Sequence, residues 1–320
     1  MKFSRIRSVS PGVILRLGRP GLAVLLAVLL VLGLVAGLRL VVALGAAGAD
    51  GDGSVGDDGG SHQELELEQK LRAELLARFQ GRVPRQWGER VTGVVTRIDT
   101  TEKVVALTFD ACGGSTPASP SNGYDRDLID FLNREQIPAT LFISSRWIDA
   151  NPELFQELAR NPLFTIENHG YLHRPLSVTG RSVYGVKGTA SINEVIDEIL
   201  LNQRRIEQLT GRAPRYFRSG TAYYDEVAVE IVEALGLKAI GFDILGDAGA
   251  TFNKEQVKRA LLGVRPGSIV LCHMNHPESD TAEGLMEAVP ILKRMGFRFV
   301  RLRDYHDRLS AIGAETAARR

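Results

Sequence analysis

Between residues 93 and 302, short apolar runs alternate with longer segments in which apolar residues recur at helical spacing. Short runs rich in branched side chains predict buried strands, and a 3.6-residue period predicts amphipathic helices. The predicted strands are 93–98, 104–109, 139–143, 164–167, 239–242, 268–272 and 298–302. The predicted helices are 125–134, 152–160, 191–210, 226–235, 254–262 and 281–295. This order indicates an α/β domain with a mainly parallel sheet or barrel, spanning 93–310 and followed by a tail, 311–320.

A separate amphipathic segment lies upstream of this domain. Leucines from Leu65 to Leu76, and then Phe79, recur at mostly helical spacing among charged residues. The pattern predicts a helix within residues 62–92 that acts as a stalk, a packing helix or a dimer contact. Residues 48–61 are dominated by Gly, Asp and Ser, which bury too little apolar surface to fold, so we expect a flexible linker there.

The N-terminal residues have the pattern of a membrane segment. Residues 21–38 form an uncharged run rich in Leu and Val, close to the ~20 residues that cross a bilayer. Basic residues precede the run and acidic residues follow it, which predicts a cytoplasmic segment 1–20, a single-pass anchor 21–47 and a periplasmic or cell-surface remainder. Cleavage as a signal peptide stays open because small residues occupy 46–49. A buried core helix is disfavoured because the run has no polar face.

Composition limits the function without naming it. The chain has 320 residues, 44% of them apolar, which is enough for one large domain or two small ones. The formal net charge is +1, and Lys and Arg are spread along the chain. We therefore expect no nucleic-acid groove.

Residues capable of catalysis follow several of the predicted strands. Asp110 ends the run Val-Ala-Leu-Thr-Phe-Asp, His169 and His173 come after a later strand, and His273 comes after Gly-Ser-Ile-Val-Leu-Cys. In α/β folds the catalytic groups gather in the loops that follow strands. We therefore expect one carboxylate and three imidazoles to meet on one rim.

Each of these residues also has an ordinary structural interpretation. His169 and His173 are four residues apart, so on one side of a helical turn they could bind one divalent ion, although such a pair also arises by chance. Asp110 could instead cap the turn that follows it. His273 could be a hydrogen-bonded core residue, and His276 lies close to it in sequence.

Taken in order, these residues resemble a known family, the polysaccharide deacetylase (NodB-like) family of carbohydrate esterases. The resemblance spans residues 104–302, and it implies a distorted (β/α) barrel. It also implies hydrolysis of N-acetyl groups on a polysaccharide with a divalent metal, zinc first, with cobalt, manganese or nickel as alternatives. The segments that carry it are Thr108-Phe109-Asp110, Asn168-His169-Gly-Tyr-Leu-His173, Phe217-Arg218-Ser-Gly-Thr and Leu271-Cys-His273.

The resemblance implies roles for individual residues. Asp110 corresponds to the general base of the family and His273 to its general acid. His169 and His173 correspond to its metal-binding imidazoles, and Arg218 corresponds to the arginine that orients the base.

Two further assignments stay open at this point. Asp243 or Asp247 would supply a carboxylate partner for Arg218. Tyr223 and Tyr224 would line a sugar groove, because aromatic faces suit the apolar faces of sugars, or would pack in the core.

The chain departs from the family pattern in two places. Ala111 stands where the family has a second Asp that binds the metal. Water, Asp110 or another loop carboxylate would then complete the metal's ligands, or the metal would bind weakly, or the domain would be inactive. Residues 218–221 read Arg-Ser-Gly-Thr in place of Arg-X-Pro-Tyr, and the backbone N–H of Thr221 could still stabilise an oxyanion.

The two cysteines, Cys112 and Cys272, each lie close in sequence to a candidate catalytic residue. In an oxidising exported compartment they could form one disulfide, or they could stay as two buried thiols.

Two functions compete. An active, metal-dependent deacetylase of a cell-envelope or extracellular glycan needs all four catalytic and metal residues, whereas an inactive glycan-binding domain on the same fold does not. A peptidase is disfavoured because the sequence has no His-Glu-X-X-His motif. Residues 178–189, rich in Gly, Ser and Val, are the candidate loop for glycan specificity.

Overall fold

The computed structural model of the protein describes residues 58–313. The chain divides into two compact units, residues 1–67 and 68–320. The basic segment, the expected anchor and most of the expected linker lie outside the described residues, so these assignments stay predictions. Among the residues that are described, no helix is both long and apolar enough to cross a membrane.

Within residues 58–313, one ten-stranded sheet organises the second unit. Its strands are β1 (Val95–Ile98), β2 (Val104–Ala111), β3 (Ala139–Ile143), β4 (Phe164–Asn168), β5 (Tyr216–Phe217), β6 (Lys238–Ala239), β7 (Ile244–Leu245), β8 (Ser268–His273), β9 (Arg298–Val300) and β10 (Leu309–Ala311). They lie in the order β10-β1-β8-β2-β3-β4-β5-β6, with β7 paired to β8 and β9 paired to β2. All pairs are parallel except those that β1 makes with β8 and β10.

The sheet curls towards a closed barrel. Val95 of β1 forms a parallel bridge with Ile240, just after β6, so the two sides of the strand order approach each other. Alternate residues of β2 enter two different cores: Ala106 belongs to the cluster inside the curl, and Leu107 belongs to the cluster beneath the helices. The distorted-barrel part of the predicted fold agrees with this curled sheet.

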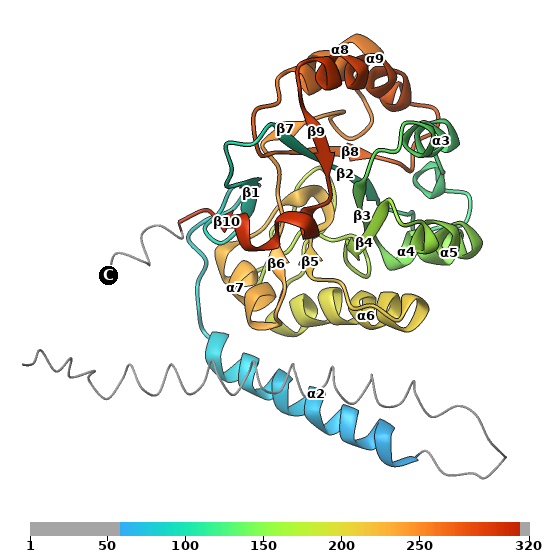
Figure 1. Cartoon of the computed structure of the whole chain (residues 1–320). Helices are drawn as coiled ribbons and strands as arrows, with labels where there is room; N and C mark the ends of the chain where they lie inside the picture. The colour runs from blue at the N-terminus through green and yellow to red at the C-terminus, as the bar shows by residue number, and fades with distance from the viewer. Residues whose placement is uncertain (1–57, 314–320) are drawn as a thin grey trace, which may run out of the picture. The chain divides into compact units, whose positions relative to one another are not determined.

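Helices cover the outside of the curl (Figure 1). Their order around the sheet runs from α8 and α9, past α3, α4 and α5, to α6 and α7. The bounds are α3 (Arg126–Arg134), α4 (Ser145–Ala150), α5 (Pro152–Arg160), α6 (Ile192–Thr210), α7 (Glu226–Ala234), α8 (Lys254–Leu262) and α9 (Thr281–Arg294). Three short 3₁₀ helices, counted within residues 58–313, are η1 (Pro120–Asn122), η2 (Gly220–Ala222) and η3 (Leu302–Arg308).

Polar caps set the start of several of these helices. The side chains of Asp125, Ser144, Ser191, Asp225 and Asn253 each accept a hydrogen bond from a backbone N–H in the first turn that follows. Such caps satisfy backbone donors that have no partner inside the helix, and each typically contributes ~1 kcal/mol.

The predicted upstream helix is α2 (Asp58–Phe79), which begins inside the stretch expected to be linker. Its residues from 68 onward use one face for packing, because Leu71, Leu75 and Phe79 are all buried. Glu68 pairs with Arg204 of α6 on the same side. Residues 68–79 therefore pack as part of the second unit.

Most other elements fall close to their predicted positions, and the differences have simple causes. The predicted strand 239–242 is replaced by β6 and β7, which lie on either side of a bend. The two-residue strands β5 and β7 are too short to give a periodic signal. Helix α4 was missed because its six residues, Ser145–Ala150, make less than two turns.

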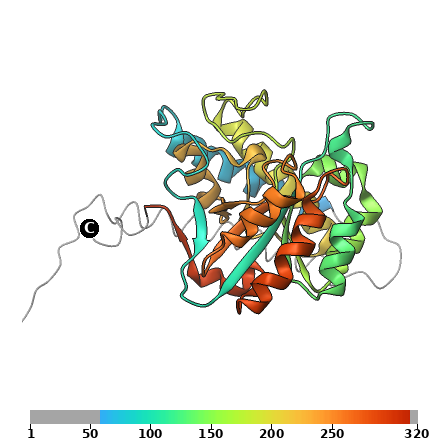
Figure 2. The same ribbon diagram turned by 90° about the horizontal axis from the view of Figure 1, so that it is seen from above.

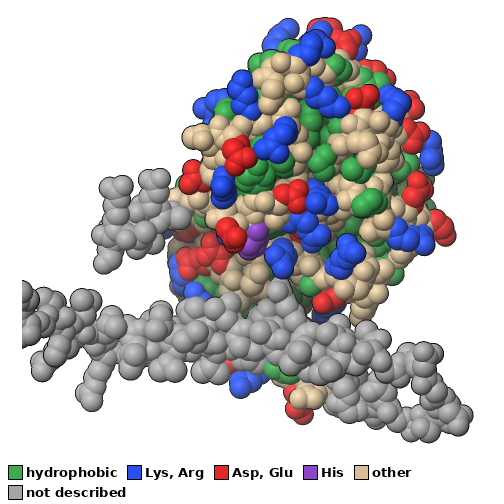
Figure 3. Space-filling model, in the orientation of Figure 1, with side chains coloured by type: hydrophobic (Ala, Val, Ile, Leu, Met, Phe, Trp, Pro, Cys, Tyr) green, Lys and Arg blue, Asp and Glu red, His purple; other side chains and the backbone are tan. Residues whose placement is uncertain are grey.

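The loops that follow the strands lie together. Figure 2 shows the loop after β2 and the long loop after β4 projecting on the same side of the sheet. On the face drawn in Figure 3, basic and acidic side chains are interspersed over the surface rather than gathered by sign.

A core substitution tests the packing of α2. Leu75 is 1% exposed and Leu65, in the same helix, is 57% exposed. We expect Leu75→Ala to lower the free energy of unfolding by ~2–5 kcal/mol, because it removes buried methyl groups and leaves a cavity. The matched change Leu65→Ala should alter it by less than about 0.5 kcal/mol. Urea denaturation of the full chain measures both, and equal effects would contradict the packing.

Candidate functional site

Four of the predicted residues lie where strands end. Asp110 is near the end of β2, His273 ends β8, His169 follows β4 and Arg218 follows β5. Asp110 and His273 are register partners across the parallel pair β2–β8. Because parallel strands end on one edge of a sheet, the structure brings these residues together on a single rim, as the sequence pattern predicts.

An ion pair between Asp110 and Arg218 forms the centre of the site. Nη1 of Arg218 lies 2.7 Å from Oδ1 of Asp110, and both side chains are buried. The remaining guanidinium nitrogens donate to the carbonyl groups of Ile240 and Gly241. Burial raises the pKa of Asp110, but the charges of Arg218 and of two nearby histidines outweigh it, so the net pKa lies below its ordinary value. Asp110 is therefore ionised and can accept a proton.

His169 is oriented by the backbone of the same arginine. Its Nδ1 lies 2.9 Å from the carbonyl oxygen of Arg218, which can only accept, so Nδ1 carries the proton. The other nitrogen, Nε2, faces Oδ2 of Asp110 at 3.5 Å. Burial lowers the pKa of His169, but the Asp110 carboxylate outweighs it and raises the pKa. The Asp110 carboxylate therefore favours positive charge at Nε2, from a proton or from a bound cation.

His173 reaches the same point through a turn that is not helical. Gly170 and His173 have positive φ angles of 85° and 55°. The ring centroids of His169 and His173 lie 4.7 Å apart. The expectation of a helical turn between the two histidines is therefore wrong, because a left-handed backbone, which Gly170 adopts without strain, reverses the chain instead.

Glu198 and Gly220 hold this turn in place. The buried carboxylate of Glu198, on α6, accepts the backbone N–H groups of Leu172 and Arg174, on either side of His173. Burial raises the pKa of Glu198 to about 7. A Cβ at Gly220 would lie 2.2 Å from the carbonyl oxygen of His173, so only glycine allows the two loops to approach this closely.

His273 pairs with Asp247. Its Nδ1 lies 2.9 Å from Oδ1 of Asp247, and Oδ2 of Asp247 accepts the backbone N–H of His273 and the hydroxyl of Thr281. Burial lowers the pKa of His273, but the Asp247 carboxylate outweighs it and raises the pKa well above its ordinary value. His273 therefore holds a proton that it can donate.

The assignment of Asp243 to the catalytic site is wrong. Asp243 accepts the hydroxyl of Ser268 and the backbone N–H of Ile269, at the start of β8, and it lies 3.5 Å from Arg97. His273 is at the other end of that strand. Neither carboxylate considered from the sequence is the partner of Arg218, because Asp110 itself fills that place.

Cys112 and Cys272 are free thiols, so the structure contains the second of the two alternatives left by the sequence. Cys272 is fully buried, and burial raises its pKa well above the ordinary value. Cys112 is partly buried just after β2, with its Sγ 3.9 Å from Nε2 of His169. Burial raises the pKa of Cys112, but the charge of His173 and hydrogen bonds with neighbouring histidines outweigh it and lower the pKa well below its ordinary value.

Among residues 58–313, one group of three metal-ligand side chains comes together: Cys112, His169 and His173. Their donor atoms all lie within 4.8 Å of one another. Sulfur and imidazole nitrogen are ligands that zinc and similar divalent ions accept, so this donor set fits the metal that the resemblance implies. Reasoning from the sequence missed Cys112 because it sought an oxygen ligand to replace the one missing at Ala111.

The structure is compatible with the role predicted for Thr221 but not with the sugar-binding role predicted for Tyr224. Thr221 lies in η2 with a φ angle of 67°, which is unusual for a β-branched residue. Backbone strain of this kind is typical of functional sites and is compatible with the predicted role of its N–H. Tyr224 is fully buried; its hydroxyl accepts the N–H of Ser219 and donates to the carbonyl of Ile240. The sugar-binding role predicted for Tyr224 is therefore wrong.

Tyr223 is partly exposed and belongs to a group of three aromatic side chains. Its ring centroid lies 5.7 Å from that of Trp87 and 5.7 Å from that of Tyr184. Arg181 lies over the ring of Trp87 at 5.2 Å. Tyr184 and Arg181 come from the loop 178–189. We call Trp87, Tyr184 and Tyr223 the aromatic platform; the sequence indicated the loop and Tyr223 but gave no signal for Trp87.

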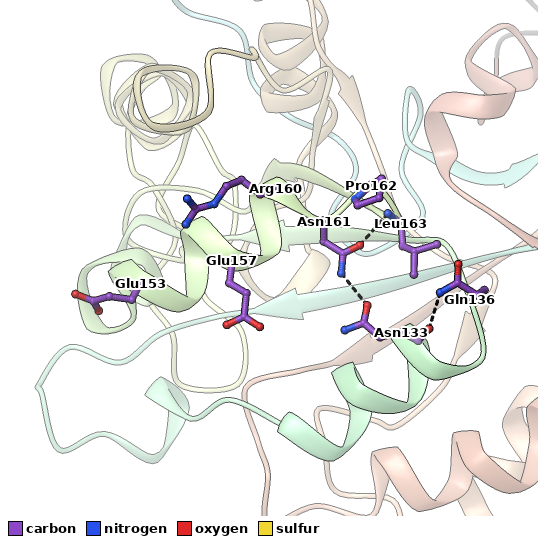
Figure 4. A pocket seen from close by; sticks show the side chains of 8 residues that line it. All are labelled: Asn133, Gln136, Glu153, Glu157, Arg160, Asn161, Pro162 and Leu163. Carbon is purple, nitrogen blue, oxygen red and sulfur yellow. Dashed lines mark hydrogen bonds between the residues drawn. The ribbon is translucent and has the colours of Figure 1, made fainter.

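A pocket of about 710 Å³ lies away from this rim, between α3 and α5 (Figure 4). Asn161 donates to Asn133 across it at 2.7 Å. Leu163, which also lines it, directly precedes β4, whereas His169 follows the other end of that strand. The pocket is thus at the opposite end of the strands and contains none of the candidate catalytic residues.

Residues 97–240 match the family model described as polysaccharide deacetylase. This region belongs to the polysaccharide deacetylase family. The resemblance predicted from the ordered motifs is therefore confirmed, and both the Asp110 and the His169 motifs fall inside the matched residues.

Curated relatives extend the similarity to most of the domain. The peptidoglycan-N-acetylmuramic acid deacetylase PdaA of Bacillus subtilis is 22% identical over 232 residues, covering 69% of this chain and 80% of that protein. The peptidoglycan-N-acetylglucosamine deacetylase PgdA of Listeria monocytogenes is 28% identical over 217 residues, covering 67% of this chain and 41% of that longer protein.

Solved structures share the fold. A family 4 carbohydrate esterase pseudoenzyme from Bacillus anthracis matches with a TM-score of 0.55 at 21% identity, covering 67% of this chain and 69% of that one. The similar structures thus include a protein described as a pseudoenzyme, and the family alone does not decide whether this chain is active.

Proposed function

We propose that this protein is a metal-dependent hydrolase that removes N-acetyl groups from a cell-envelope or extracellular polysaccharide. One observation carries the proposal: two ion pairs on the same rim hold a carboxylate ionised and an imidazole protonated. Arg218 keeps Asp110 ionised, and Asp247 keeps His273 protonated. Pairs of groups whose environments move their pKa values apart are typical of a base and an acid that act in one reaction.

The residues divide the reaction between them. Asp110 takes the proton of the attacking water, because its carboxylate is ionised and Arg218 holds only one of its oxygens. His273 gives its proton to the departing amine. The N–H of Thr221 stabilises the charge that develops on the acetyl oxygen. His169 and His173 would hold a divalent metal, with zinc the first expectation, and when bound it would supply polarisation of the acetyl carbonyl.

The substrate class follows from the family and from the surface next to the site. The relatives named above act on N-acetylated peptidoglycan sugars, as their names state. The aromatic platform offers flat apolar faces to a sugar ring, and Tyr223 lies two residues after Thr221. We further propose that the enzyme works outside the cytoplasm on the membrane anchor predicted from residues 21–47, where such glycans lie.

An inactive glycan-binding domain is the second candidate. Ala111 favours it, because the family's second Asp is absent there. The presence of Asp110, His273 and both metal-binding histidines together counts against it, because binding a glycan does not require an ordered base, acid and metal site.

Acetate release from the full chain tests the proposal. We expect acetate from N-acetylated chitin or peptidoglycan oligosaccharides in the presence of Zn²⁺ or Co²⁺. Asp110→Asn should lower the rate by ~100-fold or more, because a general base is lost, and the double variant His169→Ala, His173→Ala should abolish it. The control His276→Ala removes a histidine that pairs with Glu278 outside the site and should keep full activity.

Two outcomes of this assay would contradict the proposal. Glycan binding without acetate from any substrate would favour the inactive domain. Full acetate release by the double histidine variant would remove the metal role of His169 and His173.

The aromatic platform should contribute to substrate binding and not to chemistry. We expect Tyr223→Ala to raise KM roughly 2- to 12-fold, which corresponds to the ~0.5–1.5 kcal/mol of an aromatic contact, with kcat little changed. The control Tyr223→Phe keeps the ring and should behave like the original protein. Steady-state kinetics on a soluble oligosaccharide measures both, and a loss confined to kcat would rule out this role.

A further inference from the structure

A fixed turn directs Cys112 towards the two histidines. Cys112 is the first residue after β2, and its carbonyl accepts the hydroxyl of Ser144. Gly113 follows with a φ angle of 68°, and a Cβ there would lie 2.3 Å from the backbone N of Trp147. The backbone on both sides of Cys112 is therefore constrained, and the thiol faces His169.

The three donors are spaced for one ion. Sγ of Cys112 lies 3.9 Å from Nε2 of His169, and with the donor atom of His173 all three fall within 4.8 Å. In a tetrahedral zinc site, with Zn–S of ~2.3 Å and Zn–N of ~2.0–2.1 Å, neighbouring donors are about 3.4–3.6 Å apart. Side-chain movements of roughly 1 Å would give that geometry.

We propose that Cys112, as the thiolate, is the third protein ligand of the metal, in the place that Ala111 leaves without a carboxylate. The inference rests on the metal role proposed above for His169 and His173. Ala111 itself is fully buried in the apolar cluster beneath the helices. Because side chains alternate along a strand, the side chain of Cys112 lies on the same side of β2 as that of Asp110.

Asp110 is a poorer candidate for the third protein ligand. Its Oδ1 is held by Arg218 at 2.7 Å, and its Oδ2 is 3.5 Å from Nε2 of His169. Within the described residues, it does not join a group of three donors, whereas Cys112 does. With the thiolate as ligand, Asp110 stays free to act as the base.

The thiolate determines which metal the site prefers. It restores the single negative charge that is lost with the missing Asp, and it is a softer ligand than a carboxylate. Two imidazoles and one thiolate favour Zn²⁺, Co²⁺ or Cd²⁺ over Mg²⁺, Ca²⁺ and Mn²⁺, which prefer oxygen. Three protein ligands also leave a fourth position open, as in catalytic zinc sites.

Absorption spectroscopy of the full chain loaded with Co²⁺ tests the ligand directly. We expect a thiolate-to-Co²⁺ charge-transfer band together with the visible bands of a four-coordinate ion. Cys112→Ala should abolish the charge-transfer band and weaken Zn²⁺ binding by at least about 10-fold. Losing only a residue that hydrogen-bonds to a metal ligand already lowers metal affinity by ~10–100-fold. The matched control Cys272→Ala removes the other thiol and should keep both.

Thiol reactivity gives a second test that does not depend on whether Cys112→Ala folds. In the Cys272→Ala chain, saturating Zn²⁺ should slow modification of Cys112 by a thiol reagent at least 10-fold. Adding His169→Ala to this chain should remove the protection.

Three results would overturn the proposal. The first is one Co²⁺ bound per chain with neither the charge-transfer band nor protection of the thiol. The second is a band that persists in Cys112→Ala. The third is acetate release that resists chelators but is stopped by alkylation of Cys112, which would make the cysteine a nucleophile. A band and protection in a chain that releases no acetate would support the thiolate ligand and reject only the proposed hydrolysis.

Discussion

The buried ion pair between Arg218 and Asp110 is the interaction on which the rest of the site depends. Removing one partner of such a pair leaves an uncompensated buried charge, which typically costs ~3–5 kcal/mol. Here each guanidinium nitrogen donates a hydrogen bond, one to Asp110 and two to backbone carbonyls after β6, and the group lies over the ring of Phe142. The pair thus joins the ends of β2, β5 and β6 at the rim where the candidate catalytic residues meet.

The same arginine also links the proposed base to the proposed metal site. Its carbonyl accepts Nδ1–H of His169, so the nitrogen Nε2 faces the rim with its lone pair. His273 is held separately, by Asp247 and Thr281. The proposed base and a proposed metal ligand are therefore oriented by one residue, while the proposed acid is held by other side chains.

Much of this arrangement could be predicted from the sequence because it depends on which residues follow each strand along the chain. Apolar runs indicated the strands, and the residue that follows each run falls on the rim whatever the loops do. Contacts between distant segments could not be predicted: the choice of Asp247 over Asp243 depends on where the chain bends between β6 and β8. For Cys112 the sequence indicates only a disulfide or a buried thiol, since its neighbours His169 and His173 come from another strand end.

The pH dependence of kcat/KM tests most directly whether Asp110 is the base and His273 the acid. Asp110 must be ionised, so activity should fall as pH drops through its lowered pKa; His273 must be protonated, so activity should fall as pH rises through its raised pKa. In Asp247→Asn the carboxylate that raises the pKa of His273 is gone, so the alkaline limb should move to lower pH while the acid limb stays in place. An acid limb that moves with this substitution, or an alkaline limb that does not, would contradict the account.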